Sequence, residues 1–376
     1  MTAPVKSSLD RAIEGAIAEK RIMGTLVTVL RDGEVIYRRA AGLADREAGR
    51  AMDETLVFRL ASLTKPIVTA AAMHYVEAGT IRLDDPVTAF LPDFQPALPD
   101  GTRPAITLEH LLTHTSGLGY GFIEEPGGAY QRLGISDGLD LRPFGLAENL
   151  RRLAQAPLAF EPGSGWRYSL GIDVIGAVLE QVAREPLPAI VDRLVTGPLS
   201  MTDTAFHARE PERLATPYVD GAPEPELMVD GSVTSNVVYS PSRALDPTAY
   251  PSGGAGMVGR AADMLKFFEA MRTGGGGILK PETVAEMRRD RGGAAAQSDG
   301  PGWGFGLGWG VLADPAADGS PQAPGTLQWG GAYGHNWFID PVNRLTVLAL
   351  TNTALEGMWG QFKRDIRDAV YEEFGS

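Results

Sequence analysis

Apolar positions near the start of the chain follow two different spacings. Leu9, Ile13 and Ala16 recur at the interval of one helix face, which predicts a helix over the first part of the chain. Farther along, two runs rich in β-branched residues flank Asp32 and Gly33, a pair typical of a two-residue hairpin turn. The pattern therefore predicts an opening helix followed by a β-hairpin that begins the sheet.

A long apolar segment follows this hairpin. Residues 63–78 are apolar on almost every side and end at Gly79, as expected for a helix buried at the centre of a protein. Between about residues 80 and 250 the connections are rich in Pro and Gly, and strand patterns are sparse. The short helices predicted in this middle part cover 108–112, 146–154, 172–183 and 189–195.

Strand patterns return near the C-terminus. They predict three successive strands over 325–331, 335–340 and 344–352. An amphipathic pattern over 361–374 then predicts a closing helix. The stretch 292–302, which is rich in Gly and Ala, predicts a mobile loop.

These elements predict an α+β fold in which an antiparallel sheet flanked by helices is built from both ends of the chain. Residues 1–80 and 250–376 are expected to form this discontinuous unit. Residues 81–249 are expected to form a mostly helical inserted domain. We expect the active site to lie between the two parts.

Composition limits the partners of the protein. The 376 residues carry 47 acidic and 34 basic side chains, and the formal charge of −13 repels nucleic-acid phosphates and anionic membranes. There is no cysteine, which excludes disulfides, a thiolate nucleophile and cysteine-ligated zinc. No run of about 18 apolar residues occurs, and the start of the chain carries charges where a secretory signal would be apolar. We expect a cytoplasmic protein that binds neither nucleic acid nor membranes.

Ser62 and Lys65 lie three residues apart at the predicted start of the buried helix. Residues at this spacing share a helix face, so the lysine amine can approach the serine hydroxyl and accept its proton. Burial and the positive end of the helix both disfavour the charged amine, as a general base requires. No other charged residue follows Lys65 until Glu77, and Pro66 suits the first helical turn. The pair therefore predicts a serine nucleophile with an adjacent lysine base.

Two further segments can complete such a site. Tyr168 follows a glycine-rich turn, and its phenol can relay a proton between the serine, the lysine and the leaving group. Gly330 and Gly331 follow one another in a predicted strand, a pattern typical of close approach by a ligand or another backbone. The amide of Ala332 is therefore expected to form an oxyanion hole with the amide of Ser62.

A second serine offers a competing interpretation. Ser136 lies in a G-x-S-x-G match over 134–138, and His335 follows it in the order of an α/β-hydrolase triad. That motif requires a buried strand before the serine and a helix after it, and neither pattern is present. We interpret the match as a loop, and His114 as a residue that satisfies backbone groups at a helix end. The histidines and carboxylates show no metal-ligand spacing, so no metal or organic cofactor is expected.

Five motifs occur in order along nearly the whole chain: ASLTK, HTSGLGYG, WRYSLG, YPSGGAGM and LQWGGAYGHNWF. Together they resemble the family VIII carboxylesterases, the esterase branch of the serine β-lactamase and penicillin-binding-protein fold. The resemblance implies a β-lactamase/transpeptidase-like fold with Ser62 as the nucleophile. It places the family's lysine and tyrosine on Lys65 and Tyr168, and its Trp-Gly-Gly strand on 329–331.

Two departures from the β-lactamase pattern bear on the substrate. Leu170 stands where those enzymes have the asparagine of Tyr-x-Asn, and Trp329 stands where they have the lysine of Lys-Thr-Gly. The first change removes an amide that holds an acylamido side chain. The second replaces a cation that attracts a carboxylate with an aromatic wall. Both changes favour a neutral ester over a penicillin.

The sequence therefore predicts a serine carboxylesterase that hydrolyses short- to medium-chain esters through an acyl-enzyme on Ser62. The residues expected to line the substrate pocket are Tyr120, Trp329, Gly330, Gly331 and His335. The alternatives are a β-lactamase or D-Ala-D-Ala peptidase-like amidase, an acyltransferase on the same scaffold, and a non-catalytic penicillin-binding-type sensor. The pattern leaves open whether Lys65 or Tyr168 is the formal base, and how many subunits assemble.

Overall fold

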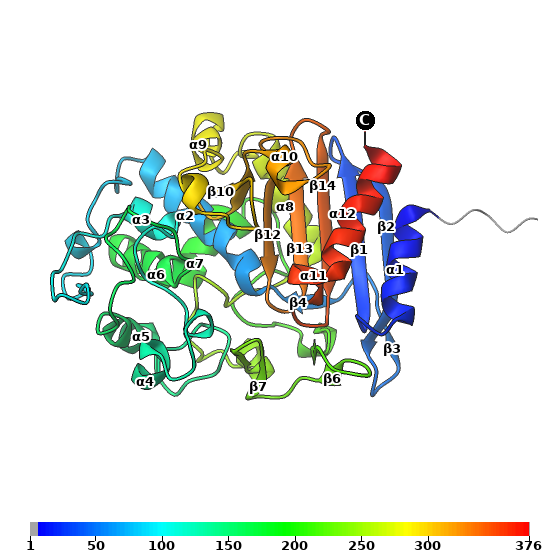
Figure 1. Ribbon diagram of the computed structural model, residues 1–376, viewed down its shortest axis with the longest axis horizontal. Helices are drawn as coiled ribbons and strands as arrows, with labels where there is room; N and C mark the ends of the chain where they lie inside the picture. Colours follow the sequence, from blue (N-terminus) through cyan, green and yellow to red (C-terminus); the bar gives the residue numbers. More distant parts are fainter. Residues whose placement is uncertain (1–6, 376) are drawn as a thin grey trace, which may run out of the picture.

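An eight-stranded antiparallel sheet forms the centre of the computed structural model, which describes residues 7–375 (Figure 1). Residues 1–6 and 376, which fall within the predicted discontinuous unit, lie outside the described residues. The strand order is β10 (Trp303–Phe305), β11 (Gly310–Leu312), β12 (Leu327–Gly331), β13 (His335–Asp340), β14 (Leu345–Thr351), β1 (Gly24–Arg31), β2 (Glu34–Asp45) and β3 (Arg50–Ala51). Strand β1 therefore pairs with β14, and the predicted α+β fold with a sheet built from both ends is confirmed.

Helices surround this sheet and form a separate group beside it. They are α1 (Ser8–Ala18), α2 (Thr64–Glu77), α3 (Leu108–Leu112), α4 (Ala129–Leu133), α5 (Leu146–Leu153), α6 (Gly171–Ala183), α7 (Leu187–Val191), α8 (Ala261–Arg272), α9 (Pro281–Met287), α10 (Pro315–Asp318), α11 (Glu356–Trp359) and α12 (Gln361–Phe374). Figure 1 shows α3 to α7 gathered on the side of β10, away from α1 and α12. Within residues 7–375, no helix combines the length and the apolar character needed to cross a membrane.

Both faces of the sheet are covered, which explains why its central strands are apolar along almost their whole length. Helices α1 and α12 lie side by side on one face (Figure 1), against Val27, Val29 and Val347. Helix α8 covers the opposite face, where Phe268 stacks on Trp337 with ring centroids 4.3 Å apart. Successive side chains of a strand point to opposite faces, so the same strands pack against α1 and α12 on one face and against α8 on the other.

Several elements differ from the sequence prediction. The predicted helix over 189–195 begins earlier, at Leu187, because Pro188 suits a first helical turn, and its α-helical part ends at Val191. The sequence pattern did not predict α8, nor the three-residue strands β10 and β11. The region with sparse strand signals also contains short pairs: β5 (Tyr218–Val219) with β6 (Glu226–Leu227), and β7 (Ser232–Thr234) with β8 (Val237–Tyr239).

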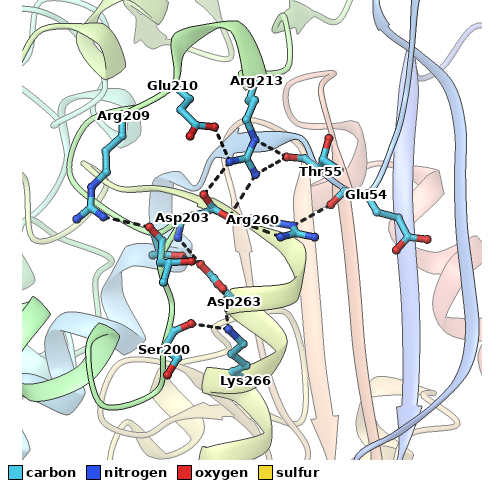
Figure 2. Close-up of polar contacts among 12 residues, drawn as sticks. Glu54, Thr55, Ser200, Asp203, Arg209, Glu210, Arg213, Arg260, Asp263 and Lys266 are labelled. Atoms are coloured by element: carbon cyan, nitrogen blue, oxygen red, sulfur yellow. Dashed lines mark hydrogen bonds and ion pairs between the residues drawn. The ribbon is translucent and has the colours of Figure 1, made fainter.

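One more pair, β4 (Val57–Arg59) with β9 (Val258–Arg260), lies beside a polar clasp (Figure 2). We define this clasp by Arg213, Asp203, Glu210, Thr55 and Arg260. Arg213 donates to both carboxylate oxygens of Asp203 at 2.8 and 3.2 Å, to Glu210 at 2.7 Å and to the carbonyl of Thr55 at 2.7 Å. Arg260 lies 3.6 Å from Asp203 on its other side. The clasp therefore ties the segment after α7 to the start of β4.

Candidate active site

Ser62 lies in a short 3₁₀ turn, η1 (Ala61–Leu63), that leads directly into α2. The residue before it, Ala61, has a φ of 46°, a left-handed conformation that costs a residue with a Cβ atom about 1–2 kcal/mol. The turn is fixed from behind, because the amide of Leu60 donates to the carbonyl of Met257 at 2.9 Å. The sharp entry into a buried helix thus leaves Ser62 partly exposed at the helix start.

Lys65 is fully buried in the first turn of α2. Its Nζ donates to Ser62 Oγ at 3.2 Å and to the carbonyl oxygen of Gly254 at 2.9 Å. A Cβ atom on Gly254 would lie only 2.5 Å from Asp173 Oδ2 and 3.5 Å from Lys65 Nζ. A glycine is therefore required for this backbone to reach the lysine. The sequence motif YPSGGAGM contained Gly254, but nothing in the pattern assigned it this contact.

Tyr168 completes the group of predicted catalytic residues. Its hydroxyl lies 2.6 Å from Ser62 Oγ, and Lys65 Nζ lies 4.6 Å from the centre of its ring. The indole N–H of Trp329 also donates to the Tyr168 hydroxyl at 3.4 Å. The structure thus brings Ser62, Lys65 and Tyr168 into mutual contact, with both partners bonded to the same serine oxygen.

His114 supports the loop that carries Tyr168. Its imidazole meets the Tyr168 ring edge-on at 4.8 Å, and Nδ1 lies 3.0 Å from the hydroxyl of Ser169. Burial, together with the nearby Lys65, lowers the pKa of His114 well below its ordinary value, so the ring is neutral. The imidazole of His114 therefore bonds a side-chain hydroxyl and packs against Tyr168, whereas the sequence predicted that it would satisfy backbone groups at a helix end.

The strand β12 lies directly against η1. A Cβ atom on Gly331 would be 2.6 Å from the carbonyl oxygen of Leu60, so only glycine permits this approach. The next residue, Ala332, lines the same cavity as Ser62. Its carbonyl accepts hydrogen bonds from the hydroxyl of Tyr239 at 3.0 Å and from the amide of Leu355 at 3.2 Å. These two bonds fix the carbonyl side of Ala332, the residue whose amide the sequence predicts in the oxyanion hole.

His335 lies away from the cavity, in contrast to its predicted place in the substrate pocket. It is buried, with Nε2 2.9 Å from the carbonyl oxygen of Arg59, and Nδ1 accepts from the amide of Thr351 at 3.3 Å. A carbonyl can only accept and an amide can only donate, so the imidazole carries its proton on Nε2. Burial lowers the pKa of His335 to about 4. The histidine therefore connects β13 to the strand that precedes the nucleophile.

Ser62 opens into a cavity of about 200 Å³. Its wall is mainly apolar, and six aromatic side chains contribute to it: Tyr120, Phe122, Trp166, Tyr168, Trp329 and Trp359. The predicted wall residues Tyr120, Trp329 and Gly330 lie there, whereas Gly331 lies behind the wall against η1. The sequence did not predict the three charged side chains of this wall, which are Asp137, Asp299 and Lys363.

Two of these residues come from segments that the sequence pattern gave other roles. Asp299 belongs to the stretch predicted as a mobile loop, and Lys363 holds both of its carboxylate oxygens at 2.5 Å. Asp137 belongs to the G-x-S-x-G match. The serine of that match, Ser136, is fully buried, donates to Asp140 and receives a hydrogen bond from Tyr250 at 3.0 Å. Among residues 7–375, no group of three His, Asp or Glu side chains is arranged to hold a metal ion.

Comparison with known proteins places this geometry among serine hydrolases. The beta-lactamase family profile matches residues 9–370. Esterase EstB from Burkholderia gladioli is 55% identical over 377 residues, which cover 98% of this chain and 96% of that protein.

Solved structures agree with this match. EstCE1, described as a hydrolase with promiscuous acyltransferase activity, aligns with a TM-score of 0.93 at 51% identity and covers 97% of this chain and 98% of its own. An octameric penicillin-binding protein homologue from Pyrococcus abyssi shares the fold at 21% identity, with a TM-score of 0.73 over 98% of this chain and 77% of its own.

Proposed function

The chain belongs to the beta-lactamase family, and we propose that it hydrolyses short- to medium-chain carboxylic esters through an acyl-enzyme on Ser62. It is a carboxylic ester hydrolase, as its 55% identity to esterase EstB indicates, and its resemblance to the esterase branch of the family is confirmed. The observation that carries the mechanism is the contact of Ser62 Oγ with both Lys65 Nζ and the Tyr168 hydroxyl.

In the first half of the reaction, Ser62 Oγ attacks the carbonyl carbon of the ester while its proton passes to the Lys65 and Tyr168 pair. The carbonyl oxygen becomes an oxyanion, which the amides of Ser62 and Ala332 stabilise by hydrogen bonding. When the tetrahedral intermediate collapses, the bond to the alcohol oxygen breaks and the pair returns the proton to that oxygen. The alcohol leaves and an acyl-enzyme remains on Ser62.

In the second half, water attacks the acyl carbon and gives its proton to the same pair. Collapse of the new intermediate breaks the bond to Ser62 Oγ, which regains a proton, and the carboxylic acid is released. The two partners act on one oxygen, and protons pass between them through it.

The cavity supports a neutral ester as the substrate. Its wall is mainly apolar, and Trp329 lies beside Tyr168, where the β-lactamase pattern has a lysine for a carboxylate. Among residues 7–375, Lys363 is the one cation that lines this cavity, and it is already bonded to Asp299. A penicillin carboxylate would therefore enter without a free cationic partner, and its desolvation would not be offset.

Acyl transfer is the second candidate activity. EstCE1, which is 51% identical to this chain, is described as having promiscuous acyltransferase activity. The aromatic wall here offers an organic alcohol a favourable surface, and an alcohol oxygen can attack the acyl-enzyme in place of water. We propose transfer to alcohols as a side reaction of the same acyl-enzyme.

The site is formed from both predicted parts of the chain, which supports their proposed division into residues 1–80 with 250–376 and residues 81–249. Ser62 and Trp329 come from the first part, and Tyr120 and Tyr168 from the second. Substrate would therefore bind between the sheet and the helical group.

Substitution of the two serines tests the proposed function. Ser62→Ala is expected to abolish hydrolysis of p-nitrophenyl butyrate, because the nucleophile is lost. Ser136→Ala is the matched control, since Ser136 is buried and bonded to Asp140 outside the group that contacts Ser62. The measurement is kcat/KM together with mass spectrometry of the acyl-enzyme. Loss of activity in folded Ser136→Ala with full activity in Ser62→Ala would overturn the assignment.

A further inference from the structure

Asp137 is a carboxylate in the wall of a mainly apolar cavity. It lines the same cavity as Ser62, together with Phe122 and Leu139. Apolar surroundings disfavour an ionised side chain unless hydrogen bonds or an opposite charge compensate for the lost water. The partners of this carboxylate therefore decide what it can do in the cavity.

Two backbone amides hold Asp137 in place. The amide of Gly121 donates to Oδ1 at 2.7 Å, and the amide of Phe122 donates to Oδ2 at 3.2 Å. A carboxylate offers about four acceptor positions, so two amide donors leave acceptor capacity on both oxygens. Within residues 7–375, Asp137 forms no ion pair with a lysine, arginine or histidine. The carboxylate is thus oriented by the protein but not neutralised by it.

The neighbouring charges are already paired. Lys363 neutralises Asp299 in the cavity wall, and Arg142 forms an ion pair with Asp140 close to Asp137. Lys65 is buried behind Ser62 and bonded to it. Asp137 is consequently the carboxylate in the wall that can meet a substrate cation without displacing a protein cation.

We propose that Asp137 is the binding site for an ammonium group of the substrate, so that the enzyme prefers esters bearing a cation to isosteric esters bearing a carboxylate. This inference rests on the proposed function, which supplies the ester reaction at Ser62. An ammonium group has three N–H donors and a positive charge, and it therefore matches the unused acceptor positions of Asp137. A carboxylate in the same place would meet a like charge and no free donor.

Without a bound cation, the ionised form of Asp137 is disfavoured. Burial, with smaller contributions from the charges of Asp140 and Asp173, raises the pKa of Asp137 to about 7. A cation bound beside the carboxylate favours its ionised form and offsets this effect. The ligand thus supplies the opposite charge that the protein leaves out.

Matched esters test the proposal by kinetics. The p-nitrophenyl esters of 6-aminohexanoic acid, heptanoic acid and pimelic acid have acyl chains of one length that end in ammonium, methyl and carboxylate. A second pair, 4-aminobutyl acetate and pentyl acetate, ends the alcohol chain in an ammonium group or in a methyl group of the same length. In the first set the cationic ester is compared with the carboxylate ester, and in the second set with the neutral ester. In at least one set, kcat/KM for the cationic ester is expected to be higher by a factor of about 10² or more, as charge-assisted hydrogen bonds allow.

Asp137→Asn is expected to lower this ratio by about tenfold or more. The heptanoate ester reports any loss of activity common to all substrates, because a disturbed loop affects each ester alike and leaves the ratio unchanged. Asp299→Asn is the matched variant of the other wall carboxylate. This substitution leaves Lys363 without its ion-pair partner. The freed lysine should then attract the carboxylate ester, so kcat/KM for that ester should rise relative to the cationic ester while Asp137 is unchanged.

Binding without turnover separates this inference from the proposed function. Titration calorimetry with hexylammonium and hexanoate ions on the wild-type protein needs no hydrolysis. Tighter binding of hexylammonium that is lost in Asp137→Asn supports the ammonium site even if no ester is cleaved. Equal ratios in wild type and Asp137→Asn, in both kinetics and calorimetry, would exclude Asp137 as a cation site.

Discussion

At the scale of single residues, the chemistry depends on one serine oxygen with two hydrogen-bond partners. Lys65 is held on its other side by the carbonyl of Gly254, and Tyr168 by the indole of Trp329. Each partner is therefore fixed before a substrate arrives, and little reorganisation is needed when the proton moves.

Removing either partner is expected to slow both halves of the reaction. Lys65→Ala and Tyr168→Phe should each lower kcat by about 10² or more, because each loses a group that moves the proton of Ser62. Stopped-flow measurement of p-nitrophenol release separates acylation from deacylation. His207→Gln, at an exposed histidine outside the cavity wall, is the control and should keep the wild-type rate. A near-normal rate in either variant would remove that residue from the mechanism.

The sequence revealed those site residues that carry a local signal. Ser62 and Lys65 are three residues apart at the start of an apolar helix, and Gly330 and Gly331 form a pair within a strand, so spacing, local context and the order of the five motifs predicted them. Gly254 and Asp137 could not, because their roles arise from contacts with segments far away in the chain.

The same limit explains why the sequence placed His335 wrongly in the substrate pocket. His335 begins a strand whose residues are buried on both faces, so alternation of apolar and polar positions gave no sign of its direction.

At the scale of elements, the site depends on how closely β12 approaches η1. The approach requires a glycine at position 331, because the carbonyl oxygen of Leu60 and the side chain of Leu63 occupy the space of a Cβ atom. The strand thus brings the proposed oxyanion amide, that of Ala332, to the turn that carries Ser62. Apolar patterns predicted both β12 and α2, but neither pattern specified their contact.

A single methyl group at this contact is expected to separate the two elements. Gly331→Ala should lower kcat/KM by about 10² or more, since displacement of β12 moves the amide of Ala332 away from the oxyanion. Gly15→Ala is the matched control: Gly15 lies inside α1 with no atom near its Cβ position, so alanine should raise the free energy of unfolding by up to about 1 kcal/mol.

Esterase assays and urea unfolding on the two glycine variants provide the comparison. Full activity in Gly331→Ala would show that β12 does not fix the oxyanion site.

At the scale of the whole molecule, the polar clasp joins the helical group to the β4 and β9 pair. Arg213 contacts two carboxylates and a backbone carbonyl, and it is about one-quarter exposed (Figure 2). Substitution of Arg213 leaves the Asp203 carboxylate with fewer hydrogen-bond donors. This costs more folding stability than the loss of an isolated surface ion pair. None of the five clasp residues lines the cavity of Ser62, so the clasp is expected to affect stability rather than chemistry.

Arg213→Ala is therefore expected to lower the free energy of unfolding by about 1–3 kcal/mol, while kcat at 25 °C stays within about twofold of wild type. Arg82→Ala is the control, because Arg82 pairs only with the exposed Asp84 and should change stability by less than about 0.5 kcal/mol. Thermal unfolding followed by circular dichroism gives both values. Equal effects of the two substitutions would exclude a joining role for the clasp.

The pairing of β1 with β14 governs how the protein can be assembled during its synthesis. These strands register from Thr25 with Thr351 to Arg31 with Leu345, so one edge of β1 has no native partner until almost the whole chain exists. At ribosomal rates of about 5–20 residues per second, that apolar edge waits for roughly half a minute. Slower translation lengthens the interval in which two nascent chains can join edge to edge, and a holding chaperone shortens the time for which the edge is free.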